Sequence, residues 1–325
     1  MNFRTTVEPA KSNFSISHEM NLMLLGSCFA ENIGNRLISL KFNVDLNPFG
    51  VIYNPDSISQ CIERLIDGRK FEKEEIFFYN ESWHSFIHHS DYSSPDFETC
   101  LNHINKRFEY SSAFLKKTNC LIITFGTAWV FYHAQSGKVV SNCHKLPSSH
   151  FERRLLDIST IIEKYETLIN SLKQINPALN IIFTVSPVRH LNDGAEGNQL
   201  SKSILIAAVH ELCKKGLGFY FPAYEIMLDD LRDYRFYDVD MIHPSQFAID
   251  YIFEKYSATC FKSDTLNLNN KIEEINKAYN HRPFNISSEA FQSFSRQMID
   301  KIKILETDYP YFDFTEEKKH FNQTK

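Results

Sequence analysis

Two short segments, far apart in the chain, carry side chains that could together transfer an acyl group from an ester. Ser27 follows an apolar run and a glycine in Leu24-Leu25-Gly26-Ser27. Asp240 and His243 come more than two hundred residues later, at a spacing that lets a carboxylate hold an imidazole. A serine hydroxyl needs a base within hydrogen-bond reach, and the base needs a group that orients it. The three residues therefore predict the nucleophile, base and orienting acid of a serine hydrolase.

Each segment also has a plainer interpretation. Ser27 could be only a helix N-cap, and Asp240 could cap a helix beside a structural histidine. The serine is not in the Gly-x-Ser-x-Gly elbow of α/β-hydrolases, because Gly26 directly precedes it and no glycine follows two residues later. Cys28 adjoins the serine, and we interpret it as a small buried residue behind the turn rather than as the nucleophile.

The elements that must position these residues follow from hydrophobic periodicity. Apolar runs predict buried strands at 21–25, 120–125, 181–185 and 219–221, and hairpins at 76–79 with 82–87 and at 129–133 with 139–140. Helical spacing predicts helices at 30–40, 57–66, 96–117, 150–175, 199–215 and 245–256. Alternating buried strands and helices favour a parallel α/β sheet covered on both faces, whose strand carboxyl ends meet at one ligand-binding edge. Ser27, Thr127 and the segment 186–189 each follow such a strand.

The apolar pattern weakens after Ser263. We expect one domain over residues 1–262 and a C-terminal helical extension over 263–325. The extension should contain two helices within 267–309, joined near His281-Arg282-Pro283, and a frayed charged tail from Thr315.

Composition excludes several classes of function. The 325 residues have a formal net charge of −5 and no basic patch, which argues against nucleic acid as a partner. No apolar run approaches the ~20 residues of a membrane span, and the N-terminal segment lacks the apolar run of a signal peptide, so we expect a cytoplasmic protein without a membrane partner. Seven cysteines fit reduced thiols. The 28 phenylalanines favour a Phe-rich core over a sugar-stacking surface.

Beyond these patterns, Gly26-Ser27-Cys28-Phe29-Ala30 spells the motif that names the GSCFA family, bacterial proteins related to SGNH hydrolases, and the chain resembles that family over roughly residues 1–260. The resemblance implies a flavodoxin-like three-layer α/β/α fold with hairpin insertions. It also implies that Ser27 is the nucleophile, that Asp240 and His243 complete the triad, and that Gly50 donates to the oxyanion. The further matching stretches are Asn47-Pro48-Phe49-Gly50, Tyr53-Asn54-Pro55, Asn142-Cys143-His144-Lys145, Ser186-Pro187-Val188-Arg189-His190 and Tyr234-Arg235-Phe236-Tyr237.

The sequence departs from the SGNH pattern at its third block. That block is Gly-x-Asn-Asp, whose asparagine donates to the oxyanion, whereas this chain has Gly126-Thr127-Ala128-Trp129. Loss of one such donor typically lowers kcat by about 10²–10³-fold. The predicted oxyanion hole therefore consists of Ser27 and Gly50 with Thr127, and Asn142 and His144 are further candidates for the missing donor.

Several other polar and aromatic residues could line the substrate pocket. They are His84, Trp129, Asn142, His144, Arg189 and His190. Arg189 follows a strand end, where it could meet an anion or a sugar hydroxyl, and its alternative is a surface ion pair. His84, His88 and His89 alternate as in a strand, without a regularly spaced acidic ligand, so we expect neither a metal nor any other cofactor.

These observations predict a serine esterase that hydrolyses a small O-acyl ester, most plausibly O-acetyl on a carbohydrate. The substrate class follows from the family resemblance alone. Two alternatives remain open: an O-acyltransferase on the same triad, and a non-catalytic descendant of the fold that binds a glycan or a protein. The sequence does not define the oligomeric state.

Overall fold

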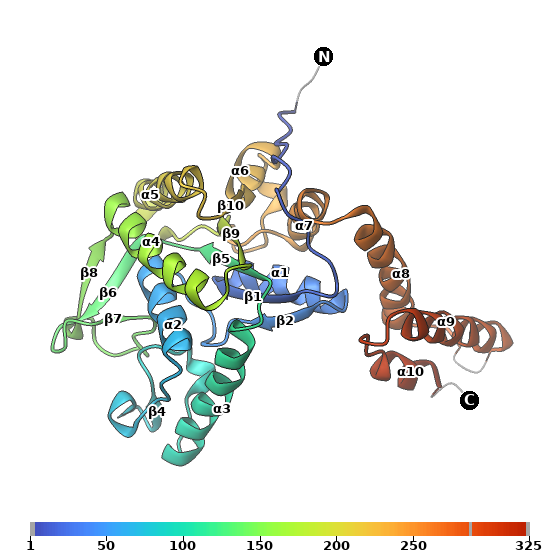
Figure 1. Ribbon diagram of the computed structural model, residues 1–325, viewed down its shortest axis with the longest axis horizontal. Helices are drawn as coiled ribbons and strands as arrows, with labels where there is room; N and C mark the ends of the chain where they lie inside the picture. Colours follow the sequence, from blue (N-terminus) through green and yellow to red (C-terminus); the bar gives the residue numbers. More distant parts are fainter. Residues whose placement is uncertain (1–3, 286–287, 323–325) are drawn as a thin grey trace.

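A parallel sheet forms the centre of the computed structural model, which describes residues 4–285 and 288–322 (Figure 1). Neighbouring strands are parallel throughout this sheet, so their carboxyl ends share one edge. The spatial order is β10-β9-β5-β1-β2, the flavodoxin-like order. The strands are β1 (Asn21–Gly26), β2 (Asn43–Leu46), β5 (Cys120–Phe125), β9 (Asn180–Val185) and β10 (Phe219–Phe221).

Helices cover both faces of the sheet and give the predicted three layers (Figure 1). Side chains of β1 alternate between two cores: Met23 and Leu25 face one, and Leu22 and Leu24 face the other. The first core is covered by α2 (Pro55–Asp67), α3 (Phe97–Leu115), α4 (Ile158–Ile175) and α5 (Gly194–Lys214). The second is covered by α1 (Cys28–Ser39), α6 (Ala223–Glu225), the π-helix Ile226–Asp230 and α7 (Gln246–Cys260). Short 3₁₀ helices lie at Lys73–Glu75, Ser90–Tyr92, Ser148–His150, Leu191–Asp193 and Tyr234–Phe236.

The helices start where the sequence supplies a capping side chain. Each cap accepts a hydrogen bond from a backbone N–H of the first turn, which has no acceptor within the helix. The capping residues are Ser27 (α1), Asn54 (α2), Asp96 (α3), Asp157 (α4) and Ser245 (α7).

One predicted helix was wrong in its first part. Residues 150–175 were expected to be helical throughout, but Phe151–Leu155 forms the strand β8 and the helix α4 starts only at Ile158. β8 pairs with β6 (Trp129–His133), which also pairs with β7 (Val139–Val140). Phe151 and Leu155 enclose three exposed residues, so the segment fits the edge of a small antiparallel sheet, and Asp157 caps the helix that follows.

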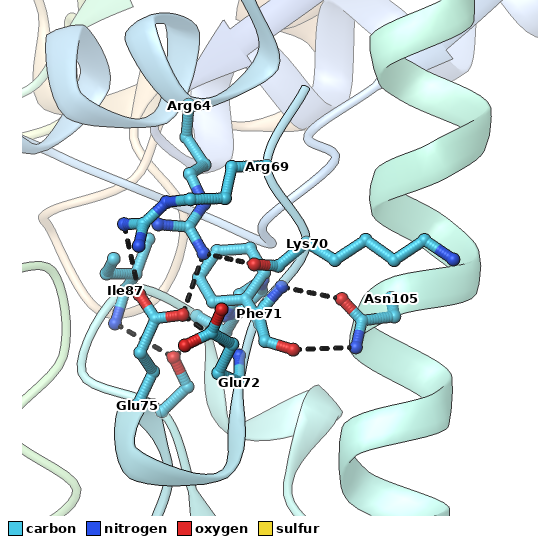
Figure 2. Close-up of polar contacts among 10 residues, drawn as sticks. Arg64, Arg69, Lys70, Phe71, Glu72, Glu75, Ile87 and Asn105 are labelled. Carbon is cyan, nitrogen blue, oxygen red and sulfur yellow. Dashed lines mark hydrogen bonds and ion pairs between the residues drawn. The ribbon is translucent and has the colours of Figure 1, made fainter. Parts of the chain in front are cut away.

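A second hairpin, β3 (Phe77–Tyr79) with β4 (Ser82–His84), lies in the segment between α2 and α3. Figure 2 shows the polar contacts that fix this segment. Arg64 on α2 donates to Lys70 O (2.6 Å) and to Glu75 (2.7 Å). Asn105 on α3 exchanges two hydrogen bonds with the backbone of Phe71 (2.8 and 3.0 Å). The insertion is therefore held by both helices that precede and follow it.

The strand β2 was not predicted, because Asn43-Val44-Asp45-Leu46 contains only two apolar residues. Its buried Asp45 is neutralised by Arg107 of α3. A tertiary ion pair thus permits a carboxylate in a strand interior that apolar patterning alone would not indicate.

The C-terminal helices lie beside the α1 and α7 layer, on the far side of the molecule from the β6-β7-β8 sheet (Figure 1). They are α8 (Ser263–Asn280), α9 (Glu289–Asp308) and α10 (Thr315–Asn322). The first two confirm the predicted helical pair. The expected frayed tail was wrong over 315–322, because Phe321 is buried and Glu317 pairs with Lys41 (2.7 Å), contacts that order a helix. The last residues of the tail, 323–325, lie outside the described residues.

Candidate active site

The nucleophile turn, defined here as Gly26 and Ser27, joins β1 to α1 at the carboxyl edge of the sheet. Gly26 has φ +151°, and a Cβ there would lie 2.3 Å from Thr124 O of β5. Its N–H donates to Asn47 Oδ1 (3.0 Å), and its carbonyl accepts from Ile52 N (2.9 Å). Only glycine fits this close approach between strands, and both polar groups of its backbone are fixed.

The Ser27 side chain is 1% exposed, and its Oγ accepts a hydrogen bond from Phe29 N (3.3 Å). The N-cap interpretation of Ser27 is therefore correct as a description of its contacts. It does not exclude a nucleophile, because the first turn of a helix presents N–H groups that stabilise an anion at this place.

Asp240 and His243 are joined as their spacing predicts. His243 Nδ1 donates to Asp240 Oδ2 (2.6 Å), while Asp240 Oδ1 accepts from the backbone N–H groups of His243 (3.0 Å) and Ile242 (2.9 Å). These bonds, that from the His243 N–H first, lower the pKa of Asp240 to about 2. The carboxylate is thus charged and oriented toward the imidazole.

The dyad loop, residues 237–244, projects into solvent but is closed on itself. Asp238 N donates to His243 O (2.8 Å), and Tyr237 bridges to Pro244. Arg189, just after β9, donates its N–H to Ile242 O (3.1 Å) and so attaches the loop to the sheet edge. The side chains of Asp240 and His243 are 44% and 45% exposed, respectively.

The structure shows no direct polar contact between the Ser27 side chain and the Asp240–His243 pair. Among the described residues, no hydrogen bond joins Ser27 Oγ to His243. Ser27 lies beneath the surface and the imidazole stands in solvent, with Nδ1 held by Asp240 and Nε2 as its second ring nitrogen.

Two predicted oxyanion donors are occupied by other acceptors. Gly50 N donates to Asn47 O (2.8 Å), and Thr127 N donates to Tyr53 O (3.0 Å). The Thr127 hydroxyl contacts Ser201 Oγ (3.1 Å) and accepts from Trp129 N (3.1 Å). In this structure neither residue offers a free backbone N–H: that of Gly50 closes its own turn, and that of Thr127 bonds the segment before α2.

Arg189 lines a cavity of about 420 Å³ beside the dyad loop. Its side chain forms no ion pair or hydrogen bond with the described residues, so the alternative of a surface ion pair is wrong, and its Nε is buried without a partner. The other lining residues are largely apolar, with one further arginine: Leu191, Ala195, Met227, Leu228, Leu231, Arg232, Asp233, Tyr234, Tyr237 and Met241.

The remaining predicted pocket residues are held in local contacts. His84 bonds Ser93 and Tyr79 O through its two ring nitrogens. The tilted ring of His144 packs against it, with centroids 4.5 Å apart, and bonds Ser85 O. Asn142 accepts from His144 N (2.9 Å). These three residues connect the β3–β4 hairpin to the segment that follows β7.

Trp129 and His190 lie nearer to the strand ends that define the sheet edge. Trp129 lies under the guanidinium of Arg153 (4.3 Å). His190 N donates to Asn198 on α5 (3.1 Å), and burial lowers the pKa of its imidazole.

Sequence reasoning missed a buried polar stripe on α5 and the role of Asn47. Asn198, Ser201 and Lys202 are fully buried, and they continue the helical spacing of Leu205, Ala208, Val209 and Leu212. Polar residues that extend an apolar stripe at positions i, i+3 and i+4 were the available signal. Asn47 orients Gly26, and its Nδ2 is buried without a partner.

Two further observations bear on chemistry. Burial raises the pKa of the Cys28 thiol, in keeping with a packing role. In residues 4–285 and 288–322, no group of three or more His, Cys, Asp or Glu side chains could hold a metal ion, and no helix is both long and apolar enough to cross a membrane.

Solved structures similar to this chain include esterases. One is a carbohydrate esterase family 3 from Talaromyces cellulolyticus, with 9% identity and a TM-score of 0.35 over 78% of this chain and 99% of that chain. Another is an acetyl esterase mutant S10A with acetate ion, with 9% identity and a TM-score of 0.35 over 79% of this chain and 99% of that chain. Similarity at this level does not indicate a substrate.

No curated protein matches the chain. Among family models, that of the GSCFA family matches residues 21–256, and that of the GSCFA domain protein, C-terminal domain, matches residues 272–324. The first match covers most of the chain and includes both the nucleophile turn and the dyad loop. The chain therefore belongs to the GSCFA family.

Proposed function

We propose that this protein is a serine esterase that uses Ser27, His243 and Asp240. The observation that carries the proposal is the Asp240–His243 pair, in which a 2.6 Å bond and two backbone N–H groups fix the carboxylate against Nδ1. This pair leaves Nε2 as the imidazole's base, on a loop attached to the edge where Ser27 lies.

The reaction follows from these positions. Ser27 Oγ attacks the ester carbonyl carbon as its proton passes to His243 Nε2, and Asp240 stabilises the imidazolium that forms. Collapse of the tetrahedral adduct breaks the bond to the alcohol oxygen, which takes the proton from His243. Water then attacks the acyl-serine by the same route and releases the carboxylic acid. The exposed imidazole must approach Ser27, and such contacts often tighten only when substrate is bound.

The oxyanion needs donors other than Gly50 and Thr127. Two groups support a hole at Ser27: the N–H groups of the first turn of α1, where that of Phe29 already donates to Ser27 Oγ, and Asn47 Nδ2. The Asn47 side chain is 8% exposed, and its Oδ1 is held by Gly26 N, so its amide has one orientation next to the nucleophile turn. We assign Nδ2 the role of the absent third-block asparagine.

The substrate is a small O-acyl ester, with O-acetyl on a carbohydrate as the first choice from the family relation to SGNH hydrolases. The cavity at Arg189, about 420 Å³, is within the range of small-molecule sites. Arg189 could bind a hydroxyl or a carboxylate of the alcohol portion, since its side chain has no partner in the described chain.

Release of acetate from acetylated monosaccharides and from 4-nitrophenyl acetate tests the proposal. The parent protein should hydrolyse both, and Ser27→Ala should abolish turnover while costing only about 1 kcal/mol of stability through loss of the α1 N-cap. Hydrolysis by Ser27→Ala at the parental rate would contradict it. Products analysed with an added sugar acceptor separate hydrolysis from transfer, because a transferase would form the acylated acceptor.

One observation favours a second candidate, a non-catalytic binding module. Ser27 is buried without a hydrogen bond to His243, and two predicted oxyanion donors are occupied. A fluorophosphonate probe separates the candidates: stoichiometric modification at Ser27 excludes an inert site, whereas no labelling with intact fold supports the binding module.

A further inference from the structure

The helix α5 presents a polar stripe to the interior, where an amphipathic helix would normally place apolar side chains. Asn198, Ser201 and Lys202 are 0% exposed. Ser201 Oγ accepts from Ala128 N (2.8 Å), and Asn198 accepts from His190 N (3.1 Å). The stripe therefore holds the segments that follow β5 and β9.

Lys202 makes the central contacts of this stripe. Its Nζ donates to Gly126 O (2.6 Å), just past β5, and to Ser186 O (2.7 Å), just past β9. β5 is the neighbour of β1, and Gly26 pairs with Thr124 across that boundary. The amine thus lies at the carboxyl ends of two adjacent strands, and one of them, β5, neighbours β1, the strand that Ser27 follows.

Gly126 and Ser186, whose carbonyls hold the amine, follow β5 and β9, and β5 pairs directly with the strand that precedes Ser27. Lys202 also interacts electrostatically with Cys28, the residue after Ser27, and with Arg189. The other titratable groups facing it are His190 and Tyr224, whose ring centroid is 5.9 Å away. No carboxylate of the described residues lies within ion-pair distance of Nζ.

We propose that Lys202 is a positioning residue for the reaction at Ser27, which ties the ends of β5 and β9 together and holds a positive charge behind the nucleophile turn. This inference rests on the proposed esterase function. It deepens that function by assigning to Lys202 part of the oxyanion stabilisation that Gly50 and Thr127 do not provide.

Burial of the Lys202 amine is unfavourable in free energy. A buried ammonium without a carboxylate is less favourable than an apolar side chain of similar volume, so packing alone does not explain a lysine here. In a water-excluded site, however, a fixed charge acts strongly on an anion that develops nearby. Burial lowers the pKa of Lys202 to about 7, so its charge changes within an accessible pH range.

The test compares the parent with Lys202→Met over pH 6–9. If the charge contributes, the variant should lose about 10²-fold in kcat at pH 6 with little change in KM, as when one oxyanion donor is removed. The loss should narrow toward pH 9, where the parent amine is neutral. Ser201→Ala is the matched control, since it removes an uncharged contact of the same stripe and its loss should not vary with pH.

If kcat of Lys202→Met fell by the same factor at every pH, the proposed role of the charge would be overturned, and only the hydrogen bonds to the strand ends would matter. If kcat did not fall at all, the proposal as a whole would be overturned. A second measurement does not need activity. The parent should gain stability relative to Lys202→Met as pH rises from about 7 toward 10.5, because the folded state holds the proton less tightly than the unfolded chain. If Ser27→Ala is fully active, the esterase mechanism fails, and this stability difference still decides whether a buried charge exists.

Discussion

Gly26 donates to Asn47 Oδ1 and accepts from Ile52 N, and the neighbouring Ser27 Oγ accepts from Phe29 N, so that Ser27 is only 1% exposed. By contrast, nearly half of the Asp240 and His243 side chains is in solvent. The nucleophile turn is built into the central sheet, and its geometry is fixed by neighbouring strands. The dyad loop is built on its own short-range contacts, and Arg189 N attaches it to the segment after β9. Under the proposed mechanism, the sheet therefore fixes Ser27, and His243 has to approach it for the reaction.

The strongest test of this comparison is whether the two regions act as one unit. Ser27→Ala and His243→Ala should each lower kcat by about 10⁴-fold or more, and the double variant should be no slower than either, because members of a triad do not act additively. Steady-state kinetics with an acetyl ester measures all three. Losses that multiply in the double variant would mean that the regions work independently.

Asp240→Asn should act on the dyad loop alone. We expect kcat to fall by about 10⁴-fold, because the amide stabilises the wrong tautomer of the imidazole, with a small change in the thermal midpoint at so exposed a site. The folded pKa of Asp240 is about 2, below the ordinary 3.8. The stability that the ionised carboxylate contributes is therefore complete above about pH 4 and is lost as pH falls toward 2. An acid limb of the parent's kcat that stays unchanged in Asp240→Asn would show that another group controls it.

Gly26→Ala should affect the nucleophile turn through stability. The new Cβ would lie 2.3 Å from Thr124 O, and we expect a loss of about 3 kcal/mol in the free energy of unfolding. Gly137→Ala is the matched control, since Gly137 also has positive φ (+65°) but nothing within 4 Å of a Cβ. It should cost about 1 kcal/mol. Equal urea midpoints for the two variants would mean that the sheet yields around Ser27.

The smallest expected effect concerns the cavity beside the dyad loop. Arg189→Met should raise KM about tenfold for an acetylated sugar acid and little for the neutral sugar, because a charged hydrogen bond to the carboxylate is lost. Arg232→Met is the control, since Arg232 lines the same cavity but is paired with Asp229 (2.5 Å). Equal effects of both variants, or equal effects on both sugars, would contradict an anion contact at Arg189.

Local patterns predicted the parts of the fold and site that depend on local sequence. The apolar run of β1 placed Ser27 on a strand-to-helix turn, and the spacing of Asp240 and His243 gave their hydrogen bond, which their own loop closes. The strand β8 was missed because its apolar residues also fit a helical period, and only pairing with β6 makes it a strand.

The occupied donors and the buried lysine could not be predicted in the same way. The N–H groups of Gly50 and Thr127 are used by Asn47 O and Tyr53 O, and such contacts depend on turn geometry. Lys202 is buried because two strand ends from distant parts of the chain provide its acceptors. A helical wheel shows its place on the inner stripe of α5, but not what it meets there.

The distance along the chain between the two regions also governs when the site can exist during synthesis. β1 and Ser27 leave the ribosome early, while Asp240 and His243 follow only after β9 and β10 have been made. At translation rates of about 5–20 residues per second, the sheet can begin to assemble well before the dyad loop appears. A nascent chain or a fragment that stops before Asp240 therefore carries the proposed nucleophile without its base. Ester hydrolysis would then report that the whole α/β domain has been made and folded.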